Sequence, residues 1–152
     1  MPTKKDIDDF LAQKRIAVVG VSRNSKEYAN EIYRALKSRG YSPYPVNPHA
    51  KQIEGDRCYA NVGEISNTVD GALVILPPAA ATQVVRQCAQ AGIRRVWLRG
   101  GSKDAMAEAI QYCREQGLSV VDGACPMMFL EPIGFAHACH RFFLKITGSL
   151  PK

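Results

Sequence analysis

The residues best suited to chemistry lie together in one turn, residues 20–25. The apolar run before it, residues 16–19, predicts a buried parallel strand, and apolar residues at helical spacing follow it. Gly20 allows a tight turn, and the side chains of Ser22, Asn24 and Ser25 can cap a helix. Because a helix N-terminus presents free N–H groups and a positive dipole end, the turn is suited to hold a phosphate. The alternative is an ordinary connection between a strand and a helix.

A charged side chain in this turn favours the phosphate interpretation. Arg23 lies inside the turn, and its guanidinium can donate two hydrogen bonds to one phosphate. The alternative is an exposed arginine at a helix start. Ser22 and Ser25 stand where the G-x-G-x-x-G pattern of NAD-binding proteins has glycines. The second predicted strand ends in Val46-Asn47-Pro48, with no carboxylate for an NAD ribose, so both departures count against NAD.

The rest of the chain predicts the elements that position this turn. Strand-like segments at residues 16–19, 41–46, 71–76, 95–98 and 118–121 alternate with helix-like ones. This alternation is typical of an α/β protein with a Rossmann-like, doubly wound parallel sheet of five strands, for which we expect the order 3-2-1-4-5. Ligands of such sheets bind outside the carboxyl ends of the strands, at the point where the strand order reverses.

Composition and charge narrow the classes of partner. The chain has 152 residues, 46% of them hydrophobic, which suits one domain with its own core. It has no apolar run of ~18 residues and no signal segment at its start, so we expect a cytoplasmic protein without a membrane partner. The net charge of +6 is scattered, which favours an anionic small ligand over nucleic acid. Five cysteines without a C-x-x-C pair argue against a disulfide framework and a zinc ribbon.

Five motifs in register resemble those of the CoA-binding domain family, the stand-alone relatives of the N-terminal domain of the succinyl-CoA synthetase alpha subunit. They are residues 16–25, residues 46–48, Val74 to Pro78, Trp97 to Gly101, and Cys125-Pro126. The resemblance implies coenzyme A as the ligand, with its phosphates on the first motif. The residues implied there are Gly20, Val21, Ser22, Arg23, Asn24 and Ser25.

The same resemblance implies where the rest of the ligand lies. Residues flanking the adenine end would be Val46, Asn47, Pro48, Leu76 and Pro77, and residues near the pantetheine would be Leu98, Arg99 and Gly100. One departure concerns the 3′-phosphate of CoA. The synthetase pattern has a lysine directly after its equivalent of Pro48, where this chain has His49. We expect Lys51 or another nearby base to take that role.

The residues indicate binding rather than turnover. The chain has three histidines, His49, His137 and His140, and no Ser-His-Asp or paired-carboxylate arrangement, so we assign no catalytic residue and no metal ligand. We expect a module that binds CoA or an acyl-CoA, as a sensor or carrier. One alternative is an enzyme, a nicotinamide-dependent oxidoreductase or a CoA-using transferase. Another is a thiol redox protein that uses Cys125. The favoured interpretation of Cys125 is a buried side chain that packs before Pro126.

The end of the chain predicts one more helix, at about residues 133–148. Its aromatic stripe includes Phe135, Phe142 and Phe143, and His137 and His140 lie three residues apart on the opposite side. That spacing can hold a metal, but surface or subunit-contact histidines are the favoured interpretation. We therefore expect a single domain over residues 1–152 with a core at about 10–127. The tail helix would pack on that core or on a second copy, which makes the protein a monomer or a homodimer.

Overall fold

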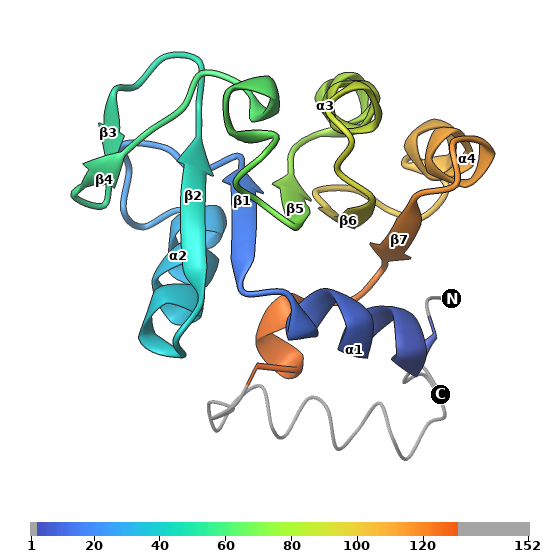
Figure 1. Cartoon of the computed structure of the whole chain (residues 1–152), viewed down its shortest axis with the longest axis horizontal. Helices are drawn as coiled ribbons and strands as arrows, with labels where there is room; N and C mark the ends of the chain where they lie inside the picture. Colours follow the sequence, from blue (N-terminus) through green and yellow to red (C-terminus); the bar gives the residue numbers. More distant parts are fainter. Residues whose placement is uncertain (1–2, 131–152) are drawn as a thin grey trace.

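The computed structural model describes residues 3–130 of the chain (Figure 1). The predicted helix at 133–148, with its aromatic stripe and with His137 and His140, lies outside the described residues. None of the helices in the described part is long and apolar enough to cross a membrane.

The five predicted strands form one parallel sheet. They are β1 (Arg15–Val19), β2 (Ser42–Val46), β5 (Gly71–Ile75), β6 (Arg95–Arg99) and β7 (Ser119–Asp122). The Rossmann-like α/β class and the five parallel strands are therefore confirmed. The expected order 3-2-1-4-5 is wrong. The sheet runs β2-β1-β5-β6-β7, so the third large strand lies beside the first and β2 is an edge.

Two prolines explain why β2 is an edge. Ser42, the β2 residue before the first proline, directs its backbone toward β1. Its N–H donates to the Lys14 carbonyl at 2.7 Å. Backbone groups of successive strand residues point to opposite sides, so Pro43 and Pro45 present their backbone to the outer side. Their carbonyls accept there, from the Tyr33 hydroxyl at 3.3 Å and the Tyr59 N–H at 2.9 Å. Since proline has no N–H, a further full strand could not pair along this side.

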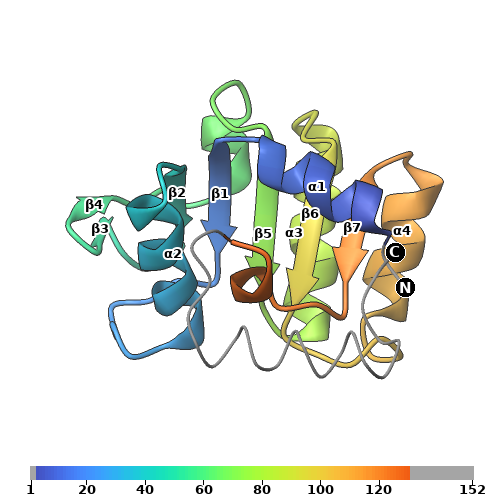
Figure 2. The ribbon, with the colours of Figure 1, turned by 90° about the horizontal axis from the view of Figure 1, so that it is seen from below.

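Helices cover both faces of the sheet (Figure 2). One face holds α1 (Lys4–Ala12), α2 (Tyr28–Ser38) and the 3-10 helix η2 (Pro126–Met128), and the other holds α3 (Pro78–Gln90) and α4 (Ala107–Glu115). The sequence Thr3-Lys-Lys-Asp6 predicts a helix start capped by Thr3, and the structure confirms it. The Thr3 hydroxyl accepts from the Asp6 N–H at 3.1 Å, and the Asp6 carboxylate accepts from the Thr3 N–H at 3.2 Å. This reciprocal capping fixes the first turn of α1.

The start of α2 differs from the prediction. The helix begins at Tyr28, with Glu27 in the N-cap position and no side-chain cap. The predicted capping residues instead make bonds within the turn: the Ser22 hydroxyl accepts from the Asn24 N–H at 3.1 Å, and the Asn24 amide oxygen accepts from the Lys26 N–H at 3.1 Å. Such local bonds compete with helix formation, which explains the later start.

A long connection joins β2 to β5. It contains a two-stranded hairpin, β3 (Gln52–Ile53) and β4 (Asp56–Arg57), and the 3-10 helix η1 (Val62–Ile65). A tight turn links the two short strands, with φ of 53° at Glu54 and 80° at Gly55. From the sequence alone we expect a loop to about Ala60 and a short helix that Asn61 caps and that runs through Ile65. The helix is present as η1, whereas the loop contains the hairpin.

Buried apolar side chains pack on both faces of the sheet. Trp97 is fully buried on the α1 side, donates its indole N–H to the Ala124 carbonyl at 2.9 Å and meets the Phe10 ring edge-on at 5.4 Å. Cys88 and Cys113 are fully buried on the other side, where they belong to the apolar stripes of α3 and α4. Burial raises the pKa of Cys88 to about 12 and that of Cys113 to about 11. These two thiols therefore act as small apolar side chains.

Candidate functional site

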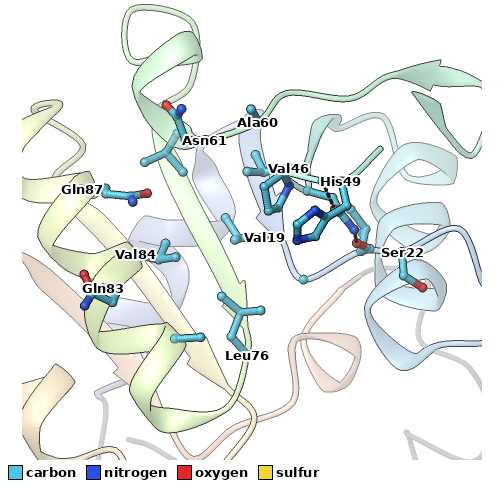
Figure 3. A pocket seen from close by; sticks show the side chains of 16 residues that line it. Val19, Ser22, Val46, His49, Ala60, Asn61, Leu76, Gln83, Val84 and Gln87 are labelled. Carbon is cyan, nitrogen blue, oxygen red and sulfur yellow. Dashed lines mark hydrogen bonds between the residues drawn. The ribbon is translucent and has the colours of Figure 1, made fainter. Parts of the chain in front are cut away.

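A cavity of about 490 Å³ lies at the carboxyl ends of β1, β2 and β5. Figure 3 shows its two sides, with Gln83 and Gln87 of α3 on one and His49 on the other. Its volume falls in the range of small-molecule sites. The lining residues are Val19, Gly20, Val21, Ser22, Val46, Asn47, Pro48, His49, Ala60, Asn61, Val62, Leu76, Ala80, Gln83, Val84 and Gln87.

Gly20 sets the shape of the cavity floor. Its φ is +115°, and a Cβ on this residue would lie 2.1 Å from the Ile75 carbonyl oxygen. Gly100 makes the same kind of approach after β6, with φ of +128° and a would-be Cβ 2.1 Å from the Leu76 carbonyl oxygen. Neither position can hold a side chain without moving the backbone of β5 or of the residue after it. The backbones at the carboxyl ends of β1, β5 and β6 therefore lie in close contact beneath the cavity.

Two buried or half-buried amides hold the turn after β1. The Asn30 side chain, fully buried on α2, accepts from the Ser22 N–H at 2.9 Å and donates to the Ser22 carbonyl at 2.7 Å. Asn47, at the end of β2, donates to the Val21 carbonyl at 2.9 Å and accepts from the His49 N–H at 2.7 Å. The turn is thus fixed from two neighbouring elements.

This arrangement changes the predicted phosphate cradle. The Ser22 N–H is taken by Asn30 and the Asn24 N–H by the Ser22 hydroxyl, so two of the four predicted donors already have partners. Among the described residues, the N–H groups of Arg23 and Ser25 have none. Arg23 itself is exposed and outside the cavity lining.

The cavity lining combines an apolar floor with a few amides. Val19, Val46 and Leu76 supply apolar surface, and the side-chain amides of Asn61, Gln83 and Gln87 have no hydrogen-bond partner among the described residues. None of the described lining residues is Asp or Glu. An apolar slot with uncommitted amides can hold a flat heteroaromatic ring and pair with its nitrogen atoms.

The structure brings together about half of the residues predicted to bind CoA. Seven line the cavity: Gly20, Val21, Ser22, Val46, Asn47, Pro48 and Leu76. Eight do not line it: Arg23, Asn24, Ser25, Lys51, Pro77, Leu98, Arg99 and Gly100. Of these, Lys51 lines an adjacent cavity and Leu98 is a core residue, 1% exposed.

Several lining residues were not predicted. Ala80, Gln83, Val84 and Gln87 come from one face of α3, and Asn61 precedes η1. The spacing of the α3 residues, at i, i+3, i+4 and i+7, marks one face of the helix. That face lies beside the fully buried stripe of the same helix. Because α3 begins directly after the end of β5, this position was the signal that could have identified these residues as part of the site.

Cys125 lies in a separate cluster on the α2 side of the sheet. Its Sγ lies 2.8 Å from the Tyr28 hydroxyl, in hydrogen-bond contact, and the Arg99 guanidinium lies 5.8 Å from the centre of the Tyr28 ring. Burial raises the pKa of Tyr28, the Cys125 contact raises it further, and Arg99 opposes both. Cys125 is half-buried, whereas the other three thiols of the described part, Cys58, Cys88 and Cys113, are buried. The redox role of Cys125 stays a prediction.

Comparison with protein families gives one match that spans most of the chain. The family model described as a CoA binding domain matches residues 14–131. The alpha subunit of an ADP-forming acetate–CoA ligase II from Pyrococcus furiosus is 32% identical over 91 residues, which are 59% of this chain and 20% of that protein. The chain spans 12% to 20% of the length of the first four ligases of this kind that it matches.

Relatives of similar length also match. The protein YneT of Bacillus subtilis is 27% identical over 125 residues, which are 82% of this chain and 91% of YneT. A solved structure from Pyrococcus horikoshii has a TM-score of 0.74 at 29% identity and covers 84% of this chain and 92% of its own. A solved Thermus thermophilus structure has a TM-score of 0.70 at 27% identity, over 80% of this chain and 91% of its own.

Proposed function

Because this chain belongs to the CoA-binding domain family, we propose that it binds coenzyme A or an acyl-CoA at the cavity between β1, β5 and α3. The observation that carries the proposal is the position of this cavity. It lies where the sheet order reverses, between β1 and β5, outside the carboxyl ends of the strands. In open α/β sheets ligands bind at this place.

The chemistry of the cavity supports the adenine end of the ligand there. An adenine ring would lie against Val19, Val46 and Leu76, with the free amides of α3 and of Asn61 within the same cavity. The absence of a carboxylate among the described lining residues removes the usual partner of an NAD ribose, which favours CoA over NAD.

The diphosphate would bind at the mouth of the turn after β1. The N–H groups of Arg23 and Ser25, together with the Arg23 guanidinium, are the donors that the turn leaves available among the described residues. From there the pantetheine would pass toward residues 98–100, at the end of β6. The protein would act as a binding module in the cytoplasm, a sensor or a carrier.

Titration calorimetry with CoA, dephospho-CoA and NAD tests the ligand. We expect CoA to bind most tightly, and NAD binding as tightly as CoA would contradict the proposal. Arg23→Ala removes a charge-assisted contact of about 1.5–3 kcal/mol, which corresponds to a loss of roughly ten- to a hundredfold in affinity. Arg114→Ala is the matched control, because it removes the same charge from the exposed C-terminal end of α4. An unchanged affinity of folded Arg23→Ala protein would contradict the assignment of the diphosphate.

A pair of tryptophan variants tests the location of the site. Ala79 and Ala80 are neighbouring exposed residues of α3, and only Ala80 lines the cavity. Ala80→Trp should fill the cavity and weaken CoA at least about tenfold, a cost of ~1.4 kcal/mol, whereas Ala79→Trp should leave binding unchanged. Equal affinities of the two variants would contradict this location.

A further inference from the structure

Three side chains with reactive or charged groups converge at the carboxyl edge of the sheet. Arg99 ends β6, Cys125 lies after β7, and Tyr28 begins α2. The Cys125 Sγ lies 2.8 Å from the Tyr28 hydroxyl, and the Arg99 guanidinium lies 5.8 Å from the centre of the Tyr28 ring. Figure 2 shows η2, which begins directly after Cys125, at the edge where β5 and β6 end. Tyr28, Arg99 and Cys125 together form the thiol cluster.

The Arg99 guanidinium lacks a partner for its charge. Its Nε atom is buried and has no hydrogen-bond acceptor in the described part of the chain. Over residues 3–130, Arg99 also forms no ion pair with a carboxylate. Most buried polar atoms of native proteins are hydrogen-bonded, because a buried charged donor without an acceptor is costly. The free Nε–H therefore points to an acceptor atom that a ligand supplies.

Backbone contacts connect the thiol cluster to the proposed nucleotide cavity. The Leu76 N–H donates to the Arg99 carbonyl at 3.0 Å, and Leu76 also lines the cavity. A Cβ on Gly100 would lie 2.1 Å from the Leu76 carbonyl oxygen, so the chain after β6 lies directly against Leu76. A ligand that extends from the cavity past Gly100 would therefore bring its far end to the thiol cluster. In an acyl-CoA, that far end is the thioester.

We propose that the thiol cluster is an acyl-transfer site, at which Cys125 accepts the acyl group of a bound acyl-CoA as a thioester. The inference rests on the proposed function, since it assumes that the nucleotide part occupies the cavity. The Cys125 sulfur attacks the thioester carbonyl carbon, so that a new C–S bond forms and the C–S bond to CoA breaks. The Cys125 proton passes to the Tyr28 hydroxyl, which donates its own proton to the departing CoA sulfur. One thioester replaces another, so no oxidant or reductant is consumed.

The surroundings of each side chain support its role in this transfer. Arg99 donates its free Nε–H to the thioester carbonyl oxygen, and this bond strengthens as negative charge develops on that oxygen. Burial raises the pKa of Tyr28, so its hydroxyl stays protonated and can relay a proton. Cys125 is half-buried, whereas the other three thiols of the described part are buried, so a bound thioester can reach Cys125 first.

Mass spectrometry of the full chain with excess acetyl-CoA tests the transfer. We expect one acetyl group per chain, located on Cys125 by peptide mapping, and one free CoA released for each acetyl group bound. Cys125→Ala should still bind acetyl-CoA in calorimetry but form no thioester. S-acetyl-N-acetylcysteamine is a matched thioester without the nucleotide. At equal concentration it should acetylate Cys125 at least about a hundredfold more slowly, because it is not held beside the thiol.

Variants of the other two side chains separate a role in the transfer from a structural role. Arg99→Gln should slow the acetylation of Cys125 about a hundredfold, the effect of removing one donor to a developing oxyanion. Its affinity for acetyl-CoA should fall less than about threefold, and Arg99→Lys should recover part of the rate. Tyr28→Phe keeps the ring and should also slow the transfer. Arg114→Ala, the control, should change neither rate nor affinity.

The outcomes separate this inference from the proposed function. If neither CoA nor acetyl-CoA binds the wild type, the proposed function fails and the inference fails with it. If acetyl-CoA binds and Cys125 stays unmodified, the inference is wrong and the proposed function stands. Equal rates with the two thioesters, or similar labelling of several cysteines, would mean a merely reactive thiol and would also overturn the site. So would an unchanged rate in folded Arg99→Gln protein. Should Arg99→Gln fail to fold, Arg99→Lys and Tyr28→Phe provide the same comparison.

Discussion

Asn30 is the side chain on which the shape of the turn after β1 depends most directly. It is fully buried on α2, and it accepts from the Ser22 N–H at 2.9 Å. It also donates to the Ser22 carbonyl at 2.7 Å and to the Glu54 carboxylate at 3.3 Å. Asn30→Ala removes these three bonds and leaves the Ser22 backbone groups without those partners. We expect the variant to lose both stability and affinity for CoA.

The expected size of the stability loss follows from the number and burial of these bonds. Each hydrogen bond contributes ~0.5–1.5 kcal/mol net, and a buried polar group left unsatisfied costs ~1–3 kcal/mol. Ser22 is only half-buried, so water can replace part of what is lost. We therefore expect a loss of about 2–4 kcal/mol. At ~2–4 °C per kcal/mol for a domain of this size, the Tm should fall by ~4–16 °C.

Thermal unfolding and calorimetry with CoA measure the two effects on the same protein. Glu31→Ala is the matched control, because Glu31 is the next residue on α2 and is exposed. Asn30→Asp keeps the size and the acceptor atom but removes both donations and sets a carboxylate beside Glu54. At neutral pH it should therefore be no more stable than Asn30→Ala.

Two results would refute this reasoning. A Tm of Asn30→Ala within ~2 °C of the wild type would mean that the bonds to Ser22 contribute little. An unchanged CoA affinity, in a variant whose Tm does fall, would mean that the turn keeps its geometry without Asn30 or that the ligand binds elsewhere. The Ala80→Trp variant then decides between these two explanations.

Three further predictions concern the backbone, the acid limit of stability and the thiols. Gly20→Ala should prevent folding or cost several kcal/mol, because its Cβ would lie 2.1 Å from a carbonyl oxygen, whereas Gly40→Ala, with open space at φ +86°, should cost only ~1 kcal/mol in a denaturant titration. The pKa of the Asp56 carboxyl is lowered, and the largest cause is the hydrogen bond from Lys37 of α2. Its contribution to stability is therefore present above the ordinary value of 3.8 and lost as the pH falls below it. Asp56→Asn should reduce this acid sensitivity, and a pH–Tm profile identical to the wild type would contradict it. Half-buried Cys125 should react with iodoacetamide before buried Cys88, which peptide mapping can measure; equal labelling rates in the folded protein would contradict this order.

Much of the fold could be predicted because apolar runs and helical stripes depend on local sequence. The five strands followed directly from the apolar runs, and the start of α1 followed from its capping residues Thr3 and Asp6. The order of the strands could not be predicted in the same way, because it depends on which strands can form backbone hydrogen bonds along both of their sides. Pro43 and Pro45 carried this information, because both remove donors from one side of β2. The prediction treated the segment as an ordinary strand and therefore placed a third strand beyond it.

The residues predicted to bind CoA line the cavity only in part, and their role in binding stays a prediction. Residues after strand ends were predictable, because their backbone direction is set by the sheet. The hairpin was missed, although Glu54-Gly55 is a turn sequence between two short segments, because strands of two residues give no periodic signal. Asn30 was missed since a polar residue in an apolar helix stripe gives no sign of its partner. Only the folded chain brings it within 2.9 Å of the Ser22 N–H.

The observed strand order gives a physical reason for the cavity at this edge of the sheet. From β1 the chain passes through α2 to β2 in one direction, and from β5 it passes through α3 to β6 in the other. Because such crossovers are right-handed, α2 and α3 must cover opposite faces of the sheet. Their starts diverge from the adjacent ends of β1 and β5, which opens a crevice between them. The connection from β2 to β5 then adds a wall to its outer side, and its hairpin is fastened to α2 through Glu54, which also contacts Asn30. Asn30 of α2 thus contacts both the turn proposed for the diphosphate and Glu54 of the hairpin, so substitutions at Asn30 and Glu54 should couple in binding rather than add.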